Sequence, residues 1–212
     1  MNEAAGNWVV PLFPEEEIPH ILEALLRCLR RLEKLNDSEL ETSLTKRLRM
    51  YLMRDPYIRD GPVWPDREAV DDDEETEAEG RLDLRFLLLD RASKPPPYFA
   101  VEAKRLHVAF DSGWKSLVPE YVTGHQGMMC FITGRYSKKL RSGAMLGYVF
   151  DGEVEKAHQS ISKALKKHNV LLKLNHPYRL FPCASLSCDS TWETKHNLDD
   201  GPFTVFHILA CV

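Results

Sequence analysis

Residues 80–107 constrain the fold of this 212-residue chain most strongly, because two alternating apolar segments flank a run of prolines. Side chains of a strand point alternately to opposite faces, so a period of two predicts strands. The first segment places four apolar side chains on one face: Leu82, Leu84, Phe86 and Leu88. The second segment is 98–104. Between them, Lys94-Pro95-Pro96-Pro97 cannot supply the ladder hydrogen bonds of a sheet. The pattern predicts a β-hairpin over 81–106 whose turn lies outside the sheet.

Charged side chains of this hairpin are placed so that they can converge. Asp83 lies opposite the leucine face, and Glu102 and Lys104 share one face of the second strand. Two carboxylates and a lysine beside a packed apolar layer suit a hard divalent cation, which prefers oxygen ligands. The structural alternative is ordinary ion pairing, of Asp83 with Arg81 or Arg85 and of Glu102 with Lys104.

The Glu-x-Lys spacing alone is a weak signal, since about one copy is expected by chance in a chain of this length. A second copy, Glu193-Thr194-Lys195, provides an internal comparison. Its neighbours are polar and no apolar alternation precedes it, so 185–201 is predicted to be a polar loop. Strand context therefore favours Glu102 as the functional copy.

With Asp83 on one strand and Glu102-Ala103-Lys104 on the next, the chain resembles the PD-(D/E)XK nuclease superfamily over roughly residues 38–150. Leu82 replaces the proline of the family name, and a literal Pro65-Asp66 upstream is interpreted as the start of the first strand or its loop. The resemblance implies an α/β (α+β) fold with a restriction-endonuclease-like core, in which a central mixed β-sheet is flanked by helices. The order of that core is a helix, a three-strand meander, a second helix and a fourth strand.

Apolar periodicity predicts elements in the order that this core requires. Helices are predicted at 17–35, 39–54, 116–134 and 153–168, and further strands near 63–70, 144–150, 178–184 and 203–212. Gly113 and Trp114 are assigned to a loop. The helix at 17–35 lies outside the family core. Residues 1–36 are therefore expected to form an N-terminal helical extension and 37–212 the nuclease domain, within one compact unit.

The resemblance also implies roles for the residues of the hairpin. Asp83 and Glu102 would hold Mg2+ or Mn2+, and the carbonyl of Ala103 would add a ligand. Lys104 would orient the attacking water or stabilise negative charge on the phosphate. Magnesium held by carboxylates activates water and neutralises the leaving oxygen in phosphodiester hydrolysis.

Two outer residues match positions that several family members use. Glu41 corresponds to a glutamate on the helix before the sheet, and Gln126 to a glutamine on the helix after the Glu-x-Lys strand. For Glu41 the structural alternative is a capping box, with its carboxylate bonded to the amide of Ser38. For Gln126 the alternative is an ordinary polar residue of a helix.

Composition limits the remaining choices. The net charge of −4 lacks the bulk basic excess of a nucleic-acid binder, although basic residues gather at 135–141 and 163–173. No apolar run is long enough to span a bilayer, and the N-terminus lacks the pattern of a secretory signal. Five cysteines without framework spacing indicate reduced thiols. A cytoplasmic protein without a membrane segment is expected.

These observations lead to the hypothesis of a Mg2+-dependent nuclease that acts on DNA more readily than on RNA. The resemblance implies a setting in antiphage defence, restriction or repair. The small size of the domain favours a homodimer or a nuclease subunit recruited by a partner protein. No separate nucleic-acid reading motif is recognisable, so sequence specificity is expected to come from loops or from another chain. The alternative is a non-catalytic subunit that keeps the fold as a scaffold of a larger complex, with the leucine-rich helix at 18–35 as its docking surface.

Overall fold

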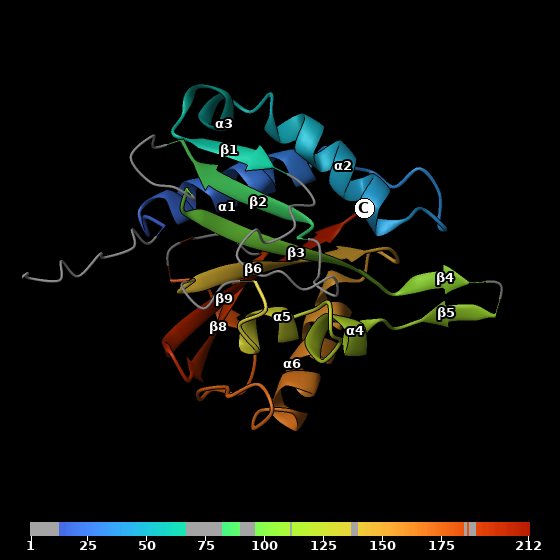
Figure 1. The fold of residues 1–212 in the computed structure, drawn as a ribbon. Coiled ribbons are helices and arrows are strands. Elements are labelled where there is room, and N and C mark those ends of the chain that lie inside the picture. Colours follow the sequence, from blue (N-terminus) through green and yellow to red (C-terminus); the bar gives the residue numbers. More distant parts are fainter. Residues whose placement is uncertain are drawn as a thin grey trace, which may run out of the picture.

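The computed structural model describes residues 13–66, 82–89, 96–110, 112–136, 140–184, 186 and 190–212. A mixed sheet of seven strands forms the middle layer, and helices cover both of its faces (Figure 1). The strand order is β1-β2-β3-β6-β9-β8-β7. The predicted α/β class, with a central mixed sheet flanked by helices, is confirmed.

The sheet combines an antiparallel meander with two parallel pairings. Its strands are β1 (Val63–Asp66), β2 (Leu84–Leu88), β3 (Tyr98–Leu106), β6 (Ser142–Val149), β7 (Phe181–Pro182), β8 (Thr191–Leu198) and β9 (Gly201–Cys211). Strands β1, β2 and β3 pair antiparallel, whereas β6 runs parallel to both β3 and β9. A separate pair, β4 (Val108–Phe110) with β5 (Gly113–Lys115), forms a small hairpin directly after β3.

Each face of the sheet has its own helices and its own apolar core. One core packs under α1 (Glu17–Leu29), α2 (Glu41–Leu52) and α3 (Pro56–Asp60). The other packs under α4 (Val118–Val122), α5 (Met129–Ile132) and α6 (Val154–Lys167), on the opposite side in Figure 1. Of the described helices, none has the length and apolar character needed to cross a bilayer.

The first helix is shorter than predicted and is part of the main core. It ends at Leu29, and a turn follows in which Asn36 Oδ1 accepts the amide of Ser38 at 3.0 Å. Its leucine face is buried with α2 and the sheet, including Ile21, Leu22 and Leu25, each 0% exposed. The docking surface that the sequence predicted at 18–35 is therefore used within the chain.

The helix predicted at 116–134 is wrong as one element. The structure has α4 and α5 with a turn between them, in which the amide of Gly127 donates to the carbonyl of Gly124. A Cβ on Gly127 would lie 2.2 Å from the carbonyl oxygen of Glu120, so the turn requires glycine there. The predicted loop at Gly113 and Trp114 is also wrong, because these residues form strand β5.

The predicted polar loop at 185–201 is contradicted by β8, which pairs with β9 along its whole length. The inward side chains of β8 are polar, and they hydrogen-bond one another instead of forming an apolar stripe. Thr194 Oγ1 lies 2.8 Å from His196 Nε2 and 2.9 Å from His207 Nε2, and all three residues are buried. A search for alternating apolar residues cannot detect such a strand.

Candidate active site

Strand β3 extends beyond its antiparallel neighbour, and this overhang creates the site. The pairing of β2 with β3 stops at Leu84 and Val101, whereas β3 continues to Leu106 in contact with β6 on its other side. From Ala103 onward, no described strand covers the β2 side of β3. Backbone groups at a strand edge still need hydrogen-bond partners when they are buried, and here side chains supply them.

Two carboxylates satisfy this exposed edge. Asp83 lies in the bend just before β2, and its Oδ2 accepts the amide of Ala103 at 2.8 Å. Two residues further along, the amide of Arg105 donates to Glu41 Oε2 at 2.9 Å. Glu41 is the first residue of α2, so the helix start is attached to the edge of β3. Both acidic groups are thereby fixed at the same end of the sheet.

The ammonium of Lys104 lies at the centre of these oxygens. It donates to Glu102 Oε1 at 2.7 Å, to Glu41 Oε1 at 2.9 Å and to the carbonyl of Ala103 at 2.6 Å. Asp83 Oδ2 is 3.7 Å away. An ammonium has three donors, and here each has an oxygen partner. Asp83, Glu102, Ala103 and Glu41, all named as candidates from the sequence, therefore surround the ammonium of Lys104.

Tyr136 fixes the inner side of the site. Its buried hydroxyl donates to Glu102 Oε2, and its carbonyl accepts the hydroxyl of Tyr98 at 2.7 Å. Glu102 is thus held through both carboxylate oxygens, with one directed to Tyr136 and the other to Lys104. Its side chain is 3% exposed, whereas that of Glu41 is 22% exposed, so the cluster has a buried side and an accessible side.

Burial and mutual repulsion shift the protonation equilibria of the cluster. Burial raises the pKa of Glu102 well above its ordinary value, and the charge of Asp83 adds to the effect. Burial also raises the pKa of Glu41, although Lys104 opposes it. For Lys104, burial alone would lower the pKa, but the charges of Glu102, Glu41 and Asp83 outweigh it and the pKa is raised. The ammonium therefore stays charged at neutral pH.

The donor set fits a hard divalent cation. Three carboxylates share one ammonium, so the cluster carries an excess of negative charge when all of its groups are ionised. Such an excess in a poorly solvated place is unfavourable unless a cation balances it. The oxygens of Asp83, Glu102 and Ala103 are ligands of the kind that Mg2+ prefers. In the described residues no three acidic, histidine or cysteine groups are arranged to hold a metal as they stand, and the ammonium occupies the centre instead.

Of the structural alternatives, the pairing of Asp83 with Arg85 and the capping box for Glu41 are wrong, whereas the ion pair of Glu102 with Lys104 is present at 2.7 Å. Arg85 pairs with Asp66, the last residue of β1, at 3.1 Å, and Arg81 lies outside the described residues. No side chain caps the start of α2, and Glu41 is bonded to Lys104 and Arg105 instead of to Ser38.

Gln126 is not brought to the cluster. It lies in the turn between α4 and α5 and not on a helix as predicted, and its side chain is exposed. Within the described ranges, no hydrogen bond or ion pair joins it to Asp83, Glu102 or Lys104. The prediction failed because the helix that would have aimed it at the sheet is broken at Gly124 and Gly127.

Sequence reasoning missed Tyr136. The residue belongs to the basic segment 135–141, so its neighbours indicate a solvated surface, yet it is 2% exposed. The only signal was its aromatic character among charged residues, which does not specify a carboxylate partner.

The second Glu-x-Lys motif shows what the first one has in addition. Glu193 and Lys195 also lie on a strand, with Glu193 buried and the two charges 3.4 Å apart. Strand β8, however, is paired on both sides around Glu193, with Phe181 of β7 and Phe206 of β9. The carboxylate of Glu193 accepts the amide of Ala184 at 3.2 Å, and no further described acidic group joins this pair. The motif is structural at this position.

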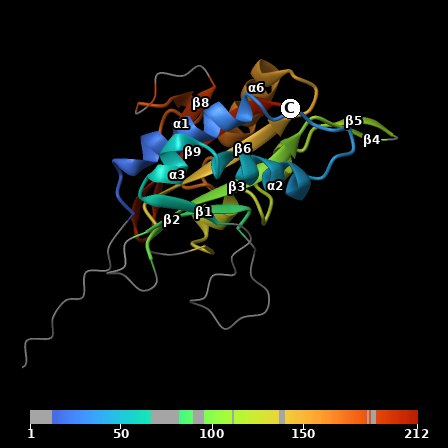
Figure 2. The ribbon, with the colours of Figure 1, turned by 90° about the horizontal axis from the view of Figure 1, so that it is seen from above.

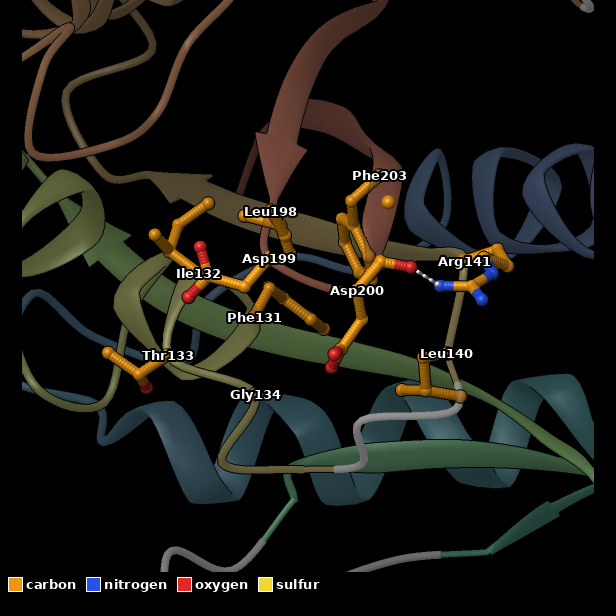
Figure 3. A pocket seen from close by; sticks show the side chains of 11 residues that line it. Phe131, Ile132, Thr133, Gly134, Leu140, Arg141, Leu198, Asp199, Asp200 and Phe203 are labelled. Carbon is orange, nitrogen blue, oxygen red and sulfur yellow. Dashed lines mark hydrogen bonds between the residues drawn. The ribbon is translucent and has the colours of Figure 1, made fainter.

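A hollow among the described residues lies away from the cluster around Lys104. It measures about 280 Å3 and is bounded by α5 and the turn between β8 and β9, with none of the cluster residues in its lining (Figure 3). Arg141 crosses its edge and donates to the carbonyl of Asp200 at 2.8 Å. Asp199 pairs with Lys173 at 2.6 Å. The charged groups here hold the turn, and the acidic cluster on β3 remains the candidate active site.

No protein-family model, curated protein or solved structure matches this chain. The geometry around Lys104 is therefore the basis for any functional conclusion.

Proposed function

We propose that the protein is a nuclease that hydrolyses phosphodiester bonds with Mg2+ or Mn2+, with DNA as the first substrate to test. The observation that carries the proposal is the convergence of Asp83, Glu102 and Glu41 on Lys104 at the open edge of β3. In this cluster an excess of carboxylates, a lysine and a partly exposed side are found together, and phosphodiester hydrolysis uses all three.

The element order adds support. Helix α2 precedes the antiparallel meander β1–β2–β3, and α4 and α5 lead into β6, which runs parallel to β3. This is the order that the resemblance to the PD-(D/E)XK superfamily requires, and a restriction-endonuclease-like core is proposed on that basis. A role in antiphage defence, restriction or repair rests on the resemblance alone.

Each residue of the cluster has a chemical task in the proposal. Asp83, Glu102 and the carbonyl of Ala103 would hold the metal, which when bound supplies an activated water and neutralises the leaving oxygen. Lys104, charged at neutral pH, would stabilise negative charge on the phosphate and cannot serve as a general base in that state. Glu41 would orient Lys104 and keep the start of α2 on β3. Tyr136 would fix the rotamer of Glu102.

The alternative function, a non-catalytic scaffold, has lost its main support. It relied on a free leucine face at 18–35, and that face is buried against α2 and the sheet. A scaffold also has no need for three carboxylates around one lysine. Unbalanced buried charge of this kind reduces stability, so a protein without a function for it gains nothing from keeping it.

A cleavage assay tests the proposal. Purified protein is incubated with plasmid, linear duplex, single-stranded DNA and RNA, in Mg2+ or Mn2+ and in EDTA. Lys104→Ala and Glu102→Ala are compared with Glu193→Gln, which alters the other Glu-x-Lys motif while keeping a group that can accept the Ala184 amide. Cleavage that requires metal, is lost in both cluster variants and is retained in Glu193→Gln supports the proposal. Equal behaviour of all proteins on every substrate contradicts it.

A further inference from the structure

The β4–β5 hairpin projects from the molecule beyond the end of the central sheet (Figures 1 and 2). It pairs Val108 with Lys115, Ala109 with Trp114 and Phe110 with Gly113. Of its strand residues only Val108 is buried in the core, and all of β5 is exposed. Gly113, with φ of 101°, permits the tight reversal at the tip. The hairpin therefore contributes little to the core packing that stabilises the fold.

The base of the hairpin is fixed relative to the candidate active site. His107 separates β3 from β4 with a φ of 52°, and its Nδ1 lies 3.1 Å from Asp151 Oδ1. Asp151 also binds Lys156 at 3.0 Å, so the direction of the ribbon is held from two elements. Trp114 is paired with Ala109, which follows Lys104 by five residues. Five residues of extended chain span at most about 17 Å, so Ala109 lies within that distance of Lys104. That reach equals about five stacked nucleotides of one strand.

Two large aromatic side chains are exposed on this ribbon. Trp114 is 57% exposed and Phe110 is 42% exposed. Paired residues share a face of a ribbon and neighbouring residues alternate, so the two rings lie on opposite faces. Trp114 stands across from the small Ala109, which leaves its ring uncovered. On the other face, Lys115 Nζ lies 5.2 Å from the centre of the Phe110 ring.

We propose that this hairpin binds unpaired nucleotides of the substrate next to the cleavage site, with one base stacked on Trp114 and another on Phe110. The identity of the adjacent site as a nuclease centre rests on the function proposed above. Aromatic rings bind bases through their flat faces, and each stacked base contributes on the order of 1–3 kcal/mol. Within a duplex both faces of a base are covered by its neighbours, so only unpaired nucleotides offer a free face. Lys115 places a positive charge near the phosphates of such a strand.

The placement of the rings favours nucleic acid over a protein or membrane partner. An apolar partner surface needs a continuous patch on one side of the molecule. Here the rings lie on opposite faces and the ammonium of Lys115 lies over one side of the Phe110 ring, so no such patch forms. A thin ribbon with one ring on each face suits two bases that are not stacked on each other, as at a junction of single and double strands.

The test measures binding without cleavage. Fluorescence anisotropy in EDTA follows a labelled single strand, a blunt duplex and a duplex with a single-stranded overhang. The variants are Trp114→Ala, Phe110→Ala and Trp114→Phe, with Trp64→Ala as the matched control, because Trp64 is 36% exposed on β1. Both alanine variants are expected to bind the single strand and the overhang about tenfold more weakly. Trp114→Phe and Trp64→Ala should bind nearly as wild type, and all four variants should melt at the wild-type temperature.

Several outcomes would overturn this proposal. The first is that the wild type does not bind the single strand. The second is that Trp114→Ala and Trp64→Ala lose the same amount of binding affinity. The third is that Trp114→Ala changes the oligomeric state of the protein in solution. The last result would identify the hairpin as a contact between copies of the chain. Cleavage by wild type and Lys104→Ala, measured in separate reactions with Mg2+ or Mn2+ and the same protein preparations, separates the two proposals. If the wild type cleaves with metal but the hairpin variants bind as it does, only the hairpin proposal is rejected. If the hairpin variants bind more weakly but no protein cleaves, only the proposed nuclease activity is rejected.

Discussion

Lys104 Nζ and Glu41 Oε1 are 2.9 Å apart, although the two residues are separated by 63 positions in the chain. The contact joins the first turn of α2 to the open edge of β3, and the other oxygen of Glu41 accepts the amide of Arg105. The helix therefore contributes a third carboxylate that neither strand of the hairpin could provide.

Replacing Glu41 by glutamine should reduce cleavage without unfolding the protein. The amide oxygen of Gln can still accept the Arg105 amide, but the charge that orients Lys104 is lost. We expect cleavage to fall on the order of 100-fold. The melting temperature should not fall, because one negative charge leaves a cluster that has too many. A matched Ser38→Ala variant should change the free energy of unfolding by no more than about 0.5 kcal/mol, since Ser38 does not cap α2.

The outcome for Glu41→Gln distinguishes a site residue from a structural one. A lower melting temperature with unchanged cleavage would assign Glu41 a purely structural role.

Divalent metal should stabilise the protein, and more strongly at pH 8 than at mildly acidic pH. Glu102 and Glu41 have raised pKa values, so their contribution to stability is present at low pH and is lost as pH rises through those values. Metal binding restores the lost stability because the cation balances the charge of the ionised carboxylates. As the pH falls, protons compete with the metal for these groups. At a metal concentration of about 100 times Kd the gain is about 2.7 kcal/mol. Thermal unfolding in Mn2+, compared with sodium at equal ionic strength, measures this increase in stability. Glu102→Gln should lose most of the increase.

Tyr136→Phe should weaken metal binding most at acidic pH. The Tyr136 hydroxyl bonds to the ionised form of Glu102 and so opposes the rise of its pKa. Without that bond the pKa of Glu102 increases further, and more protons compete with the metal. Mn2+ titrations near pH 6 and pH 8 should show a loss on the order of tenfold at the lower pH and a smaller loss at the higher. The exposed Tyr178→Phe is the control. A loss of equal size at both pH values would argue against an effect through Glu102.

A buried chain of hydrogen bonds between β8, β9 and α4 predicts sensitivity to acid. The carbonyl of Leu172 can only accept, so His196 carries its proton on Nδ1 and accepts through Nε2 from Thr194. The Thr194 oxygen then accepts from Nε2 of His207, whose Nδ1 accepts from Tyr121. In this arrangement both histidines are neutral, and the second ring nitrogen of each accepts a hydrogen bond.

The sign of the pH effect follows from the pKa values of these histidines. Burial lowers the pKa of His196 to about 4 and lowers that of His207 as well. In the unfolded chain a histidine has a pKa of about 6.5, so the unfolded state binds protons first as pH falls. The free energy of unfolding should drop by about 2 kcal/mol between pH 7.5 and pH 5 from His196 alone. Urea unfolding measures this slope, which should flatten in His196→Gln and persist in the exposed His176→Gln. Equal slopes in both variants would contradict it.

Much of the site could be predicted because its residues are close in sequence and lie on strands with clear apolar alternation. Asp83, Glu102, Ala103 and Lys104 meet as the hairpin pattern predicted. Strand context alone does not distinguish Glu102 from Glu193, since both copies lie on strands. What separates them is the overhang of β3 beyond β2. That property depends on where pairing stops, and no local pattern records it.

The remaining differences also arise from tertiary context. Strand β8 was missed because its buried side chains are threonine and histidine, whose burial depends on β9 and on Leu172. Gln126 was misplaced because Gly124 and Gly127 break a helix that apolar spacing had predicted to be continuous. Tyr136 could not be assigned to Glu102 because its segment reaches β3 through tertiary contacts, including the bond of its carbonyl to Tyr98, that no local pattern records.

The most direct test of the central claim is the rate of Mn2+-dependent cleavage by Glu102→Gln relative to Glu193→Gln. Both substitutions replace one buried carboxyl group of a Glu-x-Lys motif on a strand of the same sheet by an amide. If the cluster around Lys104 is the catalytic centre, the first variant loses cleavage by at least about 100-fold and the second cleaves as the wild type does. Comparable rates for the two variants, or an equal loss in both, would contradict the account.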